Sequence, residues 1–109
     1  GVWRVPVIEM AIPIDLSVGE VFGPFLVDAE DTLYYRFVSE GASAPSTAVL
    51  KAFSLLTDTD PGDDEGALTI DGTKANMTVS GFKYIRFAVT TTQAAKRGTL
   101  HIFARKTQE

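Results

Sequence analysis

The stretch Gly81-Phe-Lys-Tyr-Ile-Arg-Phe-Ala-Val-Thr90 decides the fold class of this chain. Successive residues of a strand face opposite sides of a sheet, so one face of this stretch carries Ile85, Phe87 and Val89. Such alternation is typical of a half-buried strand. After a polar segment, residues 91–97, the stretch Gly98-Thr-Leu-His-Ile-Phe-Ala-Arg105 alternates in the same way. We expect the two stretches to form an antiparallel hairpin.

More extended segments precede this pair. They are rich in β-branched and aromatic residues and are bounded by Gly, Pro, Asp and Ser, and they cover residues 21–27, 32–38, 47–57, 67–71 and 76–80. Gly23-Pro24 predicts a bulge or bend within the first of them. No segment shows the apolar spacing of an amphipathic helix. With about eight strands, the chain is predicted to be all-β, an antiparallel β-sandwich or a jelly-roll-like fold.

One of these segments allows a prediction of which face is buried, and in a second the two faces can be listed without a choice between them. In residues 32–38 we assign Leu33, Tyr35 and Phe37 to the core. In residues 47–57 one face carries Val49, Lys51, Phe53 and Leu55, and the other carries Leu50, Ala52, Ser54 and Leu56. The charge of Lys51 on the first face indicates either a bulge that shifts the register or a stem that runs along the surface.

Length and composition favour one globular domain. The chain has 109 residues, of which 45% are hydrophobic and 22% are charged. It lacks a run of about 18 apolar residues, so no membrane-spanning helix is expected, and its first residues do not have the pattern of a secretory signal. The sequence contains no cysteine, which excludes disulfides and thiolate metal sites. A net charge of −4 disfavours nucleic-acid binding.

Residues 1–16 are apolar and contain Pro6 and Pro13, whereas residues 17–109 form the predicted sandwich domain. Proline cannot donate to a ladder, so residues 1–16 are predicted to be either an edge strand or an extended N-terminal arm that contacts a partner. In the second case the interface residues are the apolar ones of the arm, which are Val2, Trp3, Val5, Val7, Ile8, Met10, Ile12 and Ile14.

Residues 58–66 form an acidic segment, which we interpret as a solvated hairpin turn. Short acidic loops also supply the oxygens that Ca²⁺ prefers, so a calcium site at Asp58, Asp60, Asp63 and Asp64 is the alternative. The spacing does not follow the EF-hand pattern, because no bidentate Glu follows at the twelfth position. We therefore predict no metal and no cofactor.

Catalytic signatures are missing from the sequence. His101 is the single histidine and is interpreted as a surface or interface residue. No Gly-x-Ser-x-Gly turn presents a nucleophile, and no set of nucleophile, base and orienting residue is recognisable. The chain is therefore predicted not to be an enzyme. Exposed aromatic residues mark binding surfaces, and a platform of Trp3, Tyr34 and Tyr84 would suit a sugar or a protein partner.

The layout of residues 20–105 resembles that of small β-sandwich structural proteins of tailed bacteriophage virions, of the head decoration or cement type. The resemblance lies in the strand Val-Leu-Lys-Ala-Phe-Ser-Leu-Leu at 49–56, in the acidic Gly-containing turn, and in the stretches 81–90 and 98–105. In that class a strand with a Tyr-x-Arg element, here Tyr84 and Arg86, packs before a final strand that closes the sandwich.

This resemblance implies a non-enzymatic role on the capsid surface of a virion. Such a protein binds between subunits of the major capsid protein, assembles as a homo-oligomer on the particle and stabilises the shell, without binding nucleic acid or membrane. Residues 2–14 are then expected to carry much of the contact, by adding a strand to the free edge of a neighbour. The alternative is a carbohydrate- or receptor-binding β-sandwich module.

Overall fold

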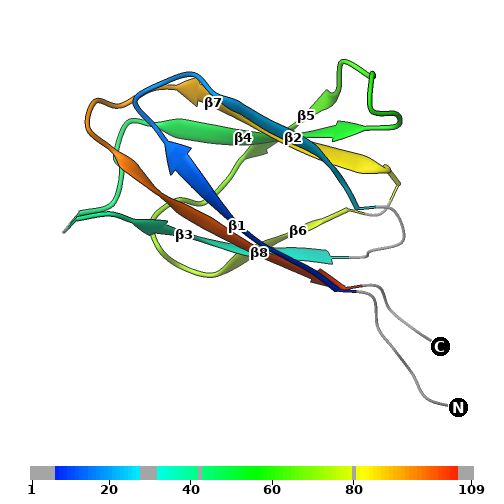
Figure 1. The fold of residues 1–109 in the computed structure, drawn as a ribbon, viewed down its shortest axis with the longest axis horizontal. Helices are drawn as coiled ribbons and strands as arrows, with labels where there is room; N and C mark the ends of the chain where they lie inside the picture. The colour runs from blue at the N-terminus through cyan, green and yellow to red at the C-terminus, as the bar shows by residue number, and fades with distance from the viewer. Residues whose placement is uncertain (1–6, 28–31, 42, 80, 106–109) are drawn as a thin grey trace, which may run out of the picture.

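The computed structural model describes residues 7–27, 32–41, 43–79 and 81–105. They form eight strands: β1 (Val7–Asp15), β2 (Val21–Leu26), β3 (Thr32–Ser39), β4 (Val49–Leu55), β5 (Asp63–Ala67), β6 (Ala75–Thr78), β7 (Tyr84–Thr91) and β8 (Arg97–Arg105). Figure 1 shows them as two stacked layers without a helix. One layer has the strand order β1-β8-β3-β6 and is called the β1 sheet, and the other has the order β2-β7-β4-β5 and is called the β2 sheet.

All strand pairs are antiparallel, and the pairing is nested. Strand β1 pairs with β8, β2 with β7, β3 with β6 and β4 with β5. This nesting arises when one long antiparallel ribbon folds over on itself, with alternate segments of the ribbon in the two sheets, and it is the arrangement of a jelly roll. The prediction of an all-β sandwich or jelly-roll-like fold is confirmed.

The predicted hairpin between residues 81–90 and 98–105 is wrong. Both segments are strands, but β7 lies in the β2 sheet and β8 in the β1 sheet. The connection between them crosses from one layer to the other, and Gln93 N and Lys96 O in this connection form hydrogen bonds with the backbone of Leu16. Alternation shows only that each strand has one buried face. Two consecutive strands can each bury one face whether they pair in a hairpin or lie in different sheets, so alternation does not predict their pairing.

The core lies between the sheets and contains one face of each long strand. Leu33, Tyr35 and Phe37 are buried, as predicted, and so are Ile85, Phe87 and Val89. In β4 the buried residues are Leu50, Ala52, Ser54 and Leu55, whereas Val49, Lys51 and Phe53 are only half-buried. Over residues 49–53 the face with Lys51 is therefore the outer face, and the Lys51 ammonium lies 2.8 Å from a carboxylate oxygen of Asp64. At the end of the strand the alternation fails, because Leu55 is buried and Leu56 is exposed.

The acidic segment differs from the predicted turn. Residues 63–67 form the edge strand β5, whereas Leu68 and Ile70, from the predicted strand at 67–71, cover the core outside any strand. Pairing of β5 with β4 is supported by the contact of Lys51 with Asp64 and by the Ser54 hydroxyl, which donates to Glu65 Oε2 at 2.7 Å. Acidic residues disfavour strands, so the sequence pattern did not reveal this one.

Candidate binding surfaces

The free edge of β1 is the first candidate binding surface. Residues 7–15 form the edge strand of the domain's own sheet, one of the two alternatives for this segment. Leu16 N donates to Lys96 O at 2.8 Å, one step beyond the pair Asp15 with Arg97. In an antiparallel ladder hydrogen-bonded pairs alternate with non-bonded pairs. The even-numbered residues of β1 therefore bond to β8, and the odd-numbered residues direct their N–H and C=O groups to the free edge.

Pro13 fits this register. It is an odd-numbered residue, so its missing N–H lies on the free edge and the ladder to β8 loses no hydrogen bond. The free edge offers N–H and C=O groups at Val7, Glu9 and Ala11, and at Pro13 a C=O group alone. Pro13 therefore sets one end of the surface available to a further strand.

The other three edges are less suited to strand addition. Strand β2 contains a bulge between Phe22 and Phe25, as predicted at Gly23-Pro24, and Gly23 has φ 106°. Strand β5 carries three exposed acidic residues in succession, and β6 has only 4 residues. Bulges, charges and short length are the usual ways in which edges avoid pairing. Among the described edges, β1 is the longest regular one.

Several predicted interface side chains face inward. Ile14 is buried, and Met10 and Ile12 pack against the core. A partner therefore reaches β1 through its backbone edge and its outward-facing side chains, and the expectation that these three side chains form the contact is corrected. The side chains of Val7 and Ile8, like residues Val2, Trp3 and Val5, lie outside what the structure describes.

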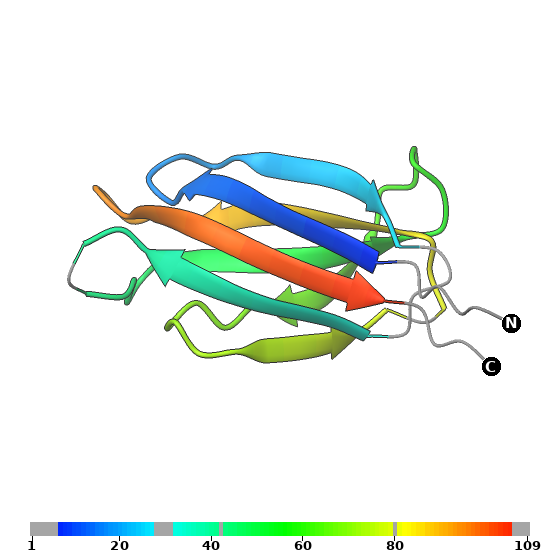
Figure 2. The same ribbon diagram turned by 60° about the horizontal axis from the view of Figure 1, so that its bottom comes forward.

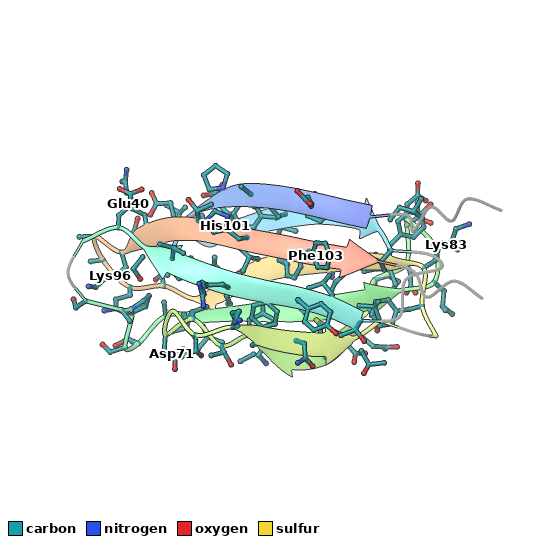
Figure 3. The ribbon with its side chains drawn as sticks, turned by 90° about the horizontal axis from the view of Figure 1, so that it is seen from below. Glu40, Asp71, Lys83, Lys96, His101 and Phe103 are labelled. Atoms are coloured by element: carbon teal, nitrogen blue, oxygen red, sulfur yellow. The ribbon has the colours of Figure 1, made fainter. Side chains whose placement is uncertain are left out.

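The second candidate is a shallow hollow of about 730 Å³ on the outer face of the β1 sheet. Figure 2 shows β1, β8 and β3 side by side across this sheet, and in Figure 3 His101 and Phe103 project from its outer face. The side chains that matter for its chemistry come from four segments of chain and are Glu9, Tyr34, Arg36, Lys74, His101 and Phe103.

These side chains form two rows across the strands. In the first row Glu9 is opposite Phe103, which is opposite Tyr34. The rings of Tyr34 and Phe103 have centroids 6.3 Å apart and are inclined by 39°. We call this the aromatic row.

The second row lies two residues along each strand. His101 is opposite Arg36, and Lys74 immediately precedes Ala75, which is opposite Tyr35. Lys74 therefore extends the row beyond Arg36. We call Arg36 and Lys74 the cationic row, and His101 lies beside it on β8. Neither Arg36 nor Lys74 has a hydrogen bond or an ion pair with the residues that the structure describes.

The predicted aromatic platform of Trp3, Tyr34 and Tyr84 is not formed. Tyr34 lies on the outer face of the β1 sheet, whereas Tyr84 lies on β7 and faces away from the core on the β2 sheet. The two rings are on opposite sides of the sandwich, and Trp3 is outside the described residues. The neighbour of Tyr34 is Phe103. The alternation of residues 98–105 placed Phe103 on the other face of its strand from Leu100 and Ile102, but the pairing of β8 with β3 was not predicted.

The acidic residues of the calcium alternative do not gather in one place. Asp60 accepts hydrogen bonds from the backbone N–H groups of Leu56 at 2.8 Å and Gly62 at 3.1 Å, and these bonds lower the pKa of its carboxyl group. The pKa of Asp64 is lowered chiefly by its hydrogen bond from Lys51. Within the described residues, no three acidic or histidine side chains are arranged to hold a metal ion. The carboxylates of Asp60 and Asp64 instead hold the β4–β5 turn and strand pairing together.

Comparison with known proteins adds information on the fold. No protein family model and no curated protein matches the sequence. A solved structure of Bacillus endospore appendages, described as a novel family of disulfide-linked pili, is similar, with a TM-score of 0.55 and 13% identity over 98% of this chain and 93% of that chain. At this identity the similarity shows the fold alone. These 109 residues contain no cysteine, so they have no counterpart of a disulfide link.

No helix in the described part of the chain has the length and apolar character needed to cross a membrane.

Proposed function

We propose that this chain is a non-enzymatic structural subunit that joins neighbouring subunits of an assembled particle through the free edge of β1. The observation that carries this proposal is the regular edge with outward N–H and C=O groups at Val7, Glu9 and Ala11. A strand from a neighbour that pairs with this edge satisfies those groups and extends the β1 sheet. The fold similarity to an appendage protein supports a role in assembly.

The specific form of the proposal is a decoration or cement protein on the capsid surface of a tailed bacteriophage virion. The partners are then the major capsid protein and further copies of this chain. Jelly rolls occur in viral capsid domains, and the negative net charge of −4 suits a surface that does not contact packaged DNA. Each backbone hydrogen bond contributes only about 0.5–1.5 kcal/mol, so affinity arises from many repeated contacts on the lattice.

A proline scan of β1 tests the edge. Ala11→Pro removes an N–H that faces outward, so the domain should stay folded while binding to the particle weakens. Ile12→Pro removes an N–H that bonds to β8, so this matched variant should lower the free energy of unfolding instead. Co-sedimentation with purified virions measures binding, and urea titration measures folding. Unchanged co-sedimentation of the folded Ala11→Pro variant would count against the β1 edge as the contact.

Truncation separates the terminal residues from the edge itself. Deleting residues 1–6 leaves β1 in place, whereas deleting residues 1–14 removes Ile14 from the core and is expected to unfold the domain. If residues 2–6 contribute to the contact, the shorter deletion should weaken co-sedimentation and leave the urea midpoint unchanged. Equal binding by the shorter deletion would restrict the contact to β1.

A second candidate function is a carbohydrate- or receptor-binding module. The observation that favours it is the hollow on the outer face of the β1 sheet, where Tyr34 is 47% exposed beside Phe103. Exposed aromatic rings that line a concave surface with polar neighbours are a common arrangement for ligand binding. Sugar binding that survives the Ala11→Pro substitution would separate this function from assembly.

A further inference from the structure

The hollow on the outer face of the β1 sheet combines two kinds of chemistry in a defined order. The aromatic row offers the rings of Tyr34 and Phe103, and the cationic row offers Arg36 and Lys74. Along a strand the two rows are two residues apart, which is about 6.6–6.8 Å. A ligand that covers both rows therefore presents an apolar face and a negative group at about that separation.

The distribution of charged side chains in the hollow indicates that the ligand is anionic. The protein has a net charge of −4, yet Arg36 and Lys74 lie together on this face, and Glu9 is the one acidic residue among the described residues of the lining. Glu9 lies on β1, whereas Lys74 immediately precedes β6, on the other side of β8 and β3. The positive charge is therefore concentrated at the β3–β6 side of the hollow, and an anionic group is attracted there.

The aromatic row favours a sugar as the carrier of that anionic group. The face of an aromatic ring is electron-rich and attracts the polarised C–H groups on the apolar face of a pyranose. The guanidinium of Arg36 matches a carboxylate in geometry and can donate two parallel hydrogen bonds to it. Glu9, at the opposite end, is an acceptor for sugar hydroxyl groups. The size of the hollow, about 730 Å³, lies within the range of known ligand sites.

We propose that this hollow binds a saccharide that carries carboxylate groups, with the sugar ring against Tyr34 and Phe103 and the carboxylate paired with Arg36 and Lys74. The inference rests on the second candidate function and is independent of assembly through β1. The acidic segment of a second copy fits less well, because two of its carboxylates are already engaged. Asp60 holds its own turn, and Asp64 pairs with Lys51.

Titration calorimetry with trigalacturonate, compared with its fully methyl-esterified form, tests the ligand class. Esterification removes the negative charge and keeps the ring, so we expect binding of the ester to be weaker by about tenfold or more, the effect of losing a charged hydrogen bond. Added salt should weaken binding of the acid, since the cations are exposed. Equal affinity for acid and ester would overturn the acidic class, and binding of neither would overturn the sugar site itself.

Variants assign the contact to individual side chains. Arg36→Gln should weaken trigalacturonate binding by about tenfold, and Tyr34→Ala should weaken both acid and ester, whereas Tyr34→Phe should bind as the wild type does. Lys83→Gln is the matched control, because Lys83 is exposed and lies away from His101 (Figure 3). Melting curves establish that each variant is folded. Unchanged binding by folded Arg36→Gln would contradict the proposed carboxylate contact.

A short poly-glutamate peptide distinguishes charge from sugar recognition. The proposal requires that it bind more weakly than trigalacturonate at equal charge and salt, because it lacks a pyranose to cover the aromatic row. Equal or tighter binding of the peptide would overturn the saccharide assignment and identify an acidic polypeptide as the occupant.

Discussion

The side-chain oxygen of Gln93 accepts a hydrogen bond from the backbone N–H of Thr47 at 2.8 Å. The same oxygen also accepts from the N–H groups of Ser46 at 3.0 Å and Ala48 at 3.1 Å. Gln93 N in turn donates to Leu16 O at 2.8 Å. One residue of the β7–β8 connection thus joins the β3–β4 loop to the residue that follows β1. Among the described residues, Gln93 is the only acceptor for these three consecutive N–H groups.

Gln93→Ala should destabilise the domain by about 1 kcal/mol, because the loop donors then exchange a fixed acceptor for water. The local effect should be larger than the global one. Amide hydrogen exchange at residues 46–48 should become faster, and urea unfolding should show the change in free energy. Gln93→Glu is the control, since it retains an oxygen at the same place. If amide exchange at residues 46–48 is the same in Gln93→Ala and in the wild type, the hydrogen bonds from these residues to Gln93 do not stabilise the loop.

Gly98→Ala should destabilise the domain by about 1–3 kcal/mol through overpacking. Gly98 lies on β8 opposite Ser39, and a Cβ atom at this position would overlap the carbonyl oxygen of Val38 and the ring of Phe37. Thermal and urea unfolding measure the change. The matched control is Gly19→Ala, where the nearest atom to the added Cβ is Val89 O at 3.7 Å. A Gly98→Ala protein as stable as Gly19→Ala would show that β3 and β8 can separate at this point without cost.

Leu50→Ala should destabilise the domain by about 2–5 kcal/mol, as is usual for removing a fully buried leucine side chain. Its neighbour Val49 faces outward and is only half-buried, so Val49→Ala should cost much less. This pair tests which face of β4 is inside. The reverse order of stabilities in urea titration would show that the face with Val49 and Lys51 is the buried one.

Stability should fall as the pH decreases below about 4, because aspartates with lowered pKa values release their stabilisation in that range. The carboxyl of Asp60 has a pKa below its ordinary value of 3.8 owing to hydrogen bonds from Leu56 and Gly62. Asp71 behaves in the same way owing to its hydrogen bonds from Thr73. A group whose pKa is lowered by folding stabilises the folded state when ionised, and this contribution disappears as the pH falls through the folded pKa.

Asp60→Asn should therefore reduce the acid sensitivity of the domain. The amide oxygen can still accept an N–H bond but does not titrate, so the melting temperature should change less between pH 5 and pH 2.5 than in the wild type, the interval in which carboxylates of about this pKa titrate. Melting by circular dichroism across this range measures the difference. Parallel curves for the two proteins would mean that the Asp60 hydrogen bonds do not stabilise the fold.

The positions of most strands and the buried faces of β3 and β7 could be predicted from the sequence, because alternation depends only on burial of one side. The faces of β4 were harder, since Leu50 and Leu56 on one face compete with Phe53 and Leu55 on the other. Which strand pairs with which could not be predicted from alternation. Alternating residues 81–90 and 98–105 fit one hairpin or two different sheets, and the nested order emerges only when all eight strands are placed.

The same limit applies to the candidate site. Tyr34 was recognisable as an outward-facing aromatic residue, but its neighbours Phe103 and Arg36 gain importance only from the register of β3 with β8. The sequence pattern indicated Tyr84 as a member of the same aromatic platform as Tyr34, but Tyr84 lies in the other sheet. In the N-terminal segment, Pro13 was compatible with an edge strand or an extended arm, and residues 7–15 form an edge strand of the β1 sheet. The inward direction of Met10 and Ile12 depended on the pairing of β1 with a strand some ninety residues away, from Val7 with Arg105 to Asp15 with Arg97.

The pairing of β1 with β8 also has a consequence for how the protein is made. Strand β1 is synthesised before the other described strands, but its only ladder partner among them is β8, the last. The β1 sheet therefore cannot be completed until β8 has been synthesised, and long-range pairing of this kind slows folding. During that interval the apolar residues of β1 have no native cover, so we expect chaperones or early contact with an assembly partner to matter most for the nascent chain.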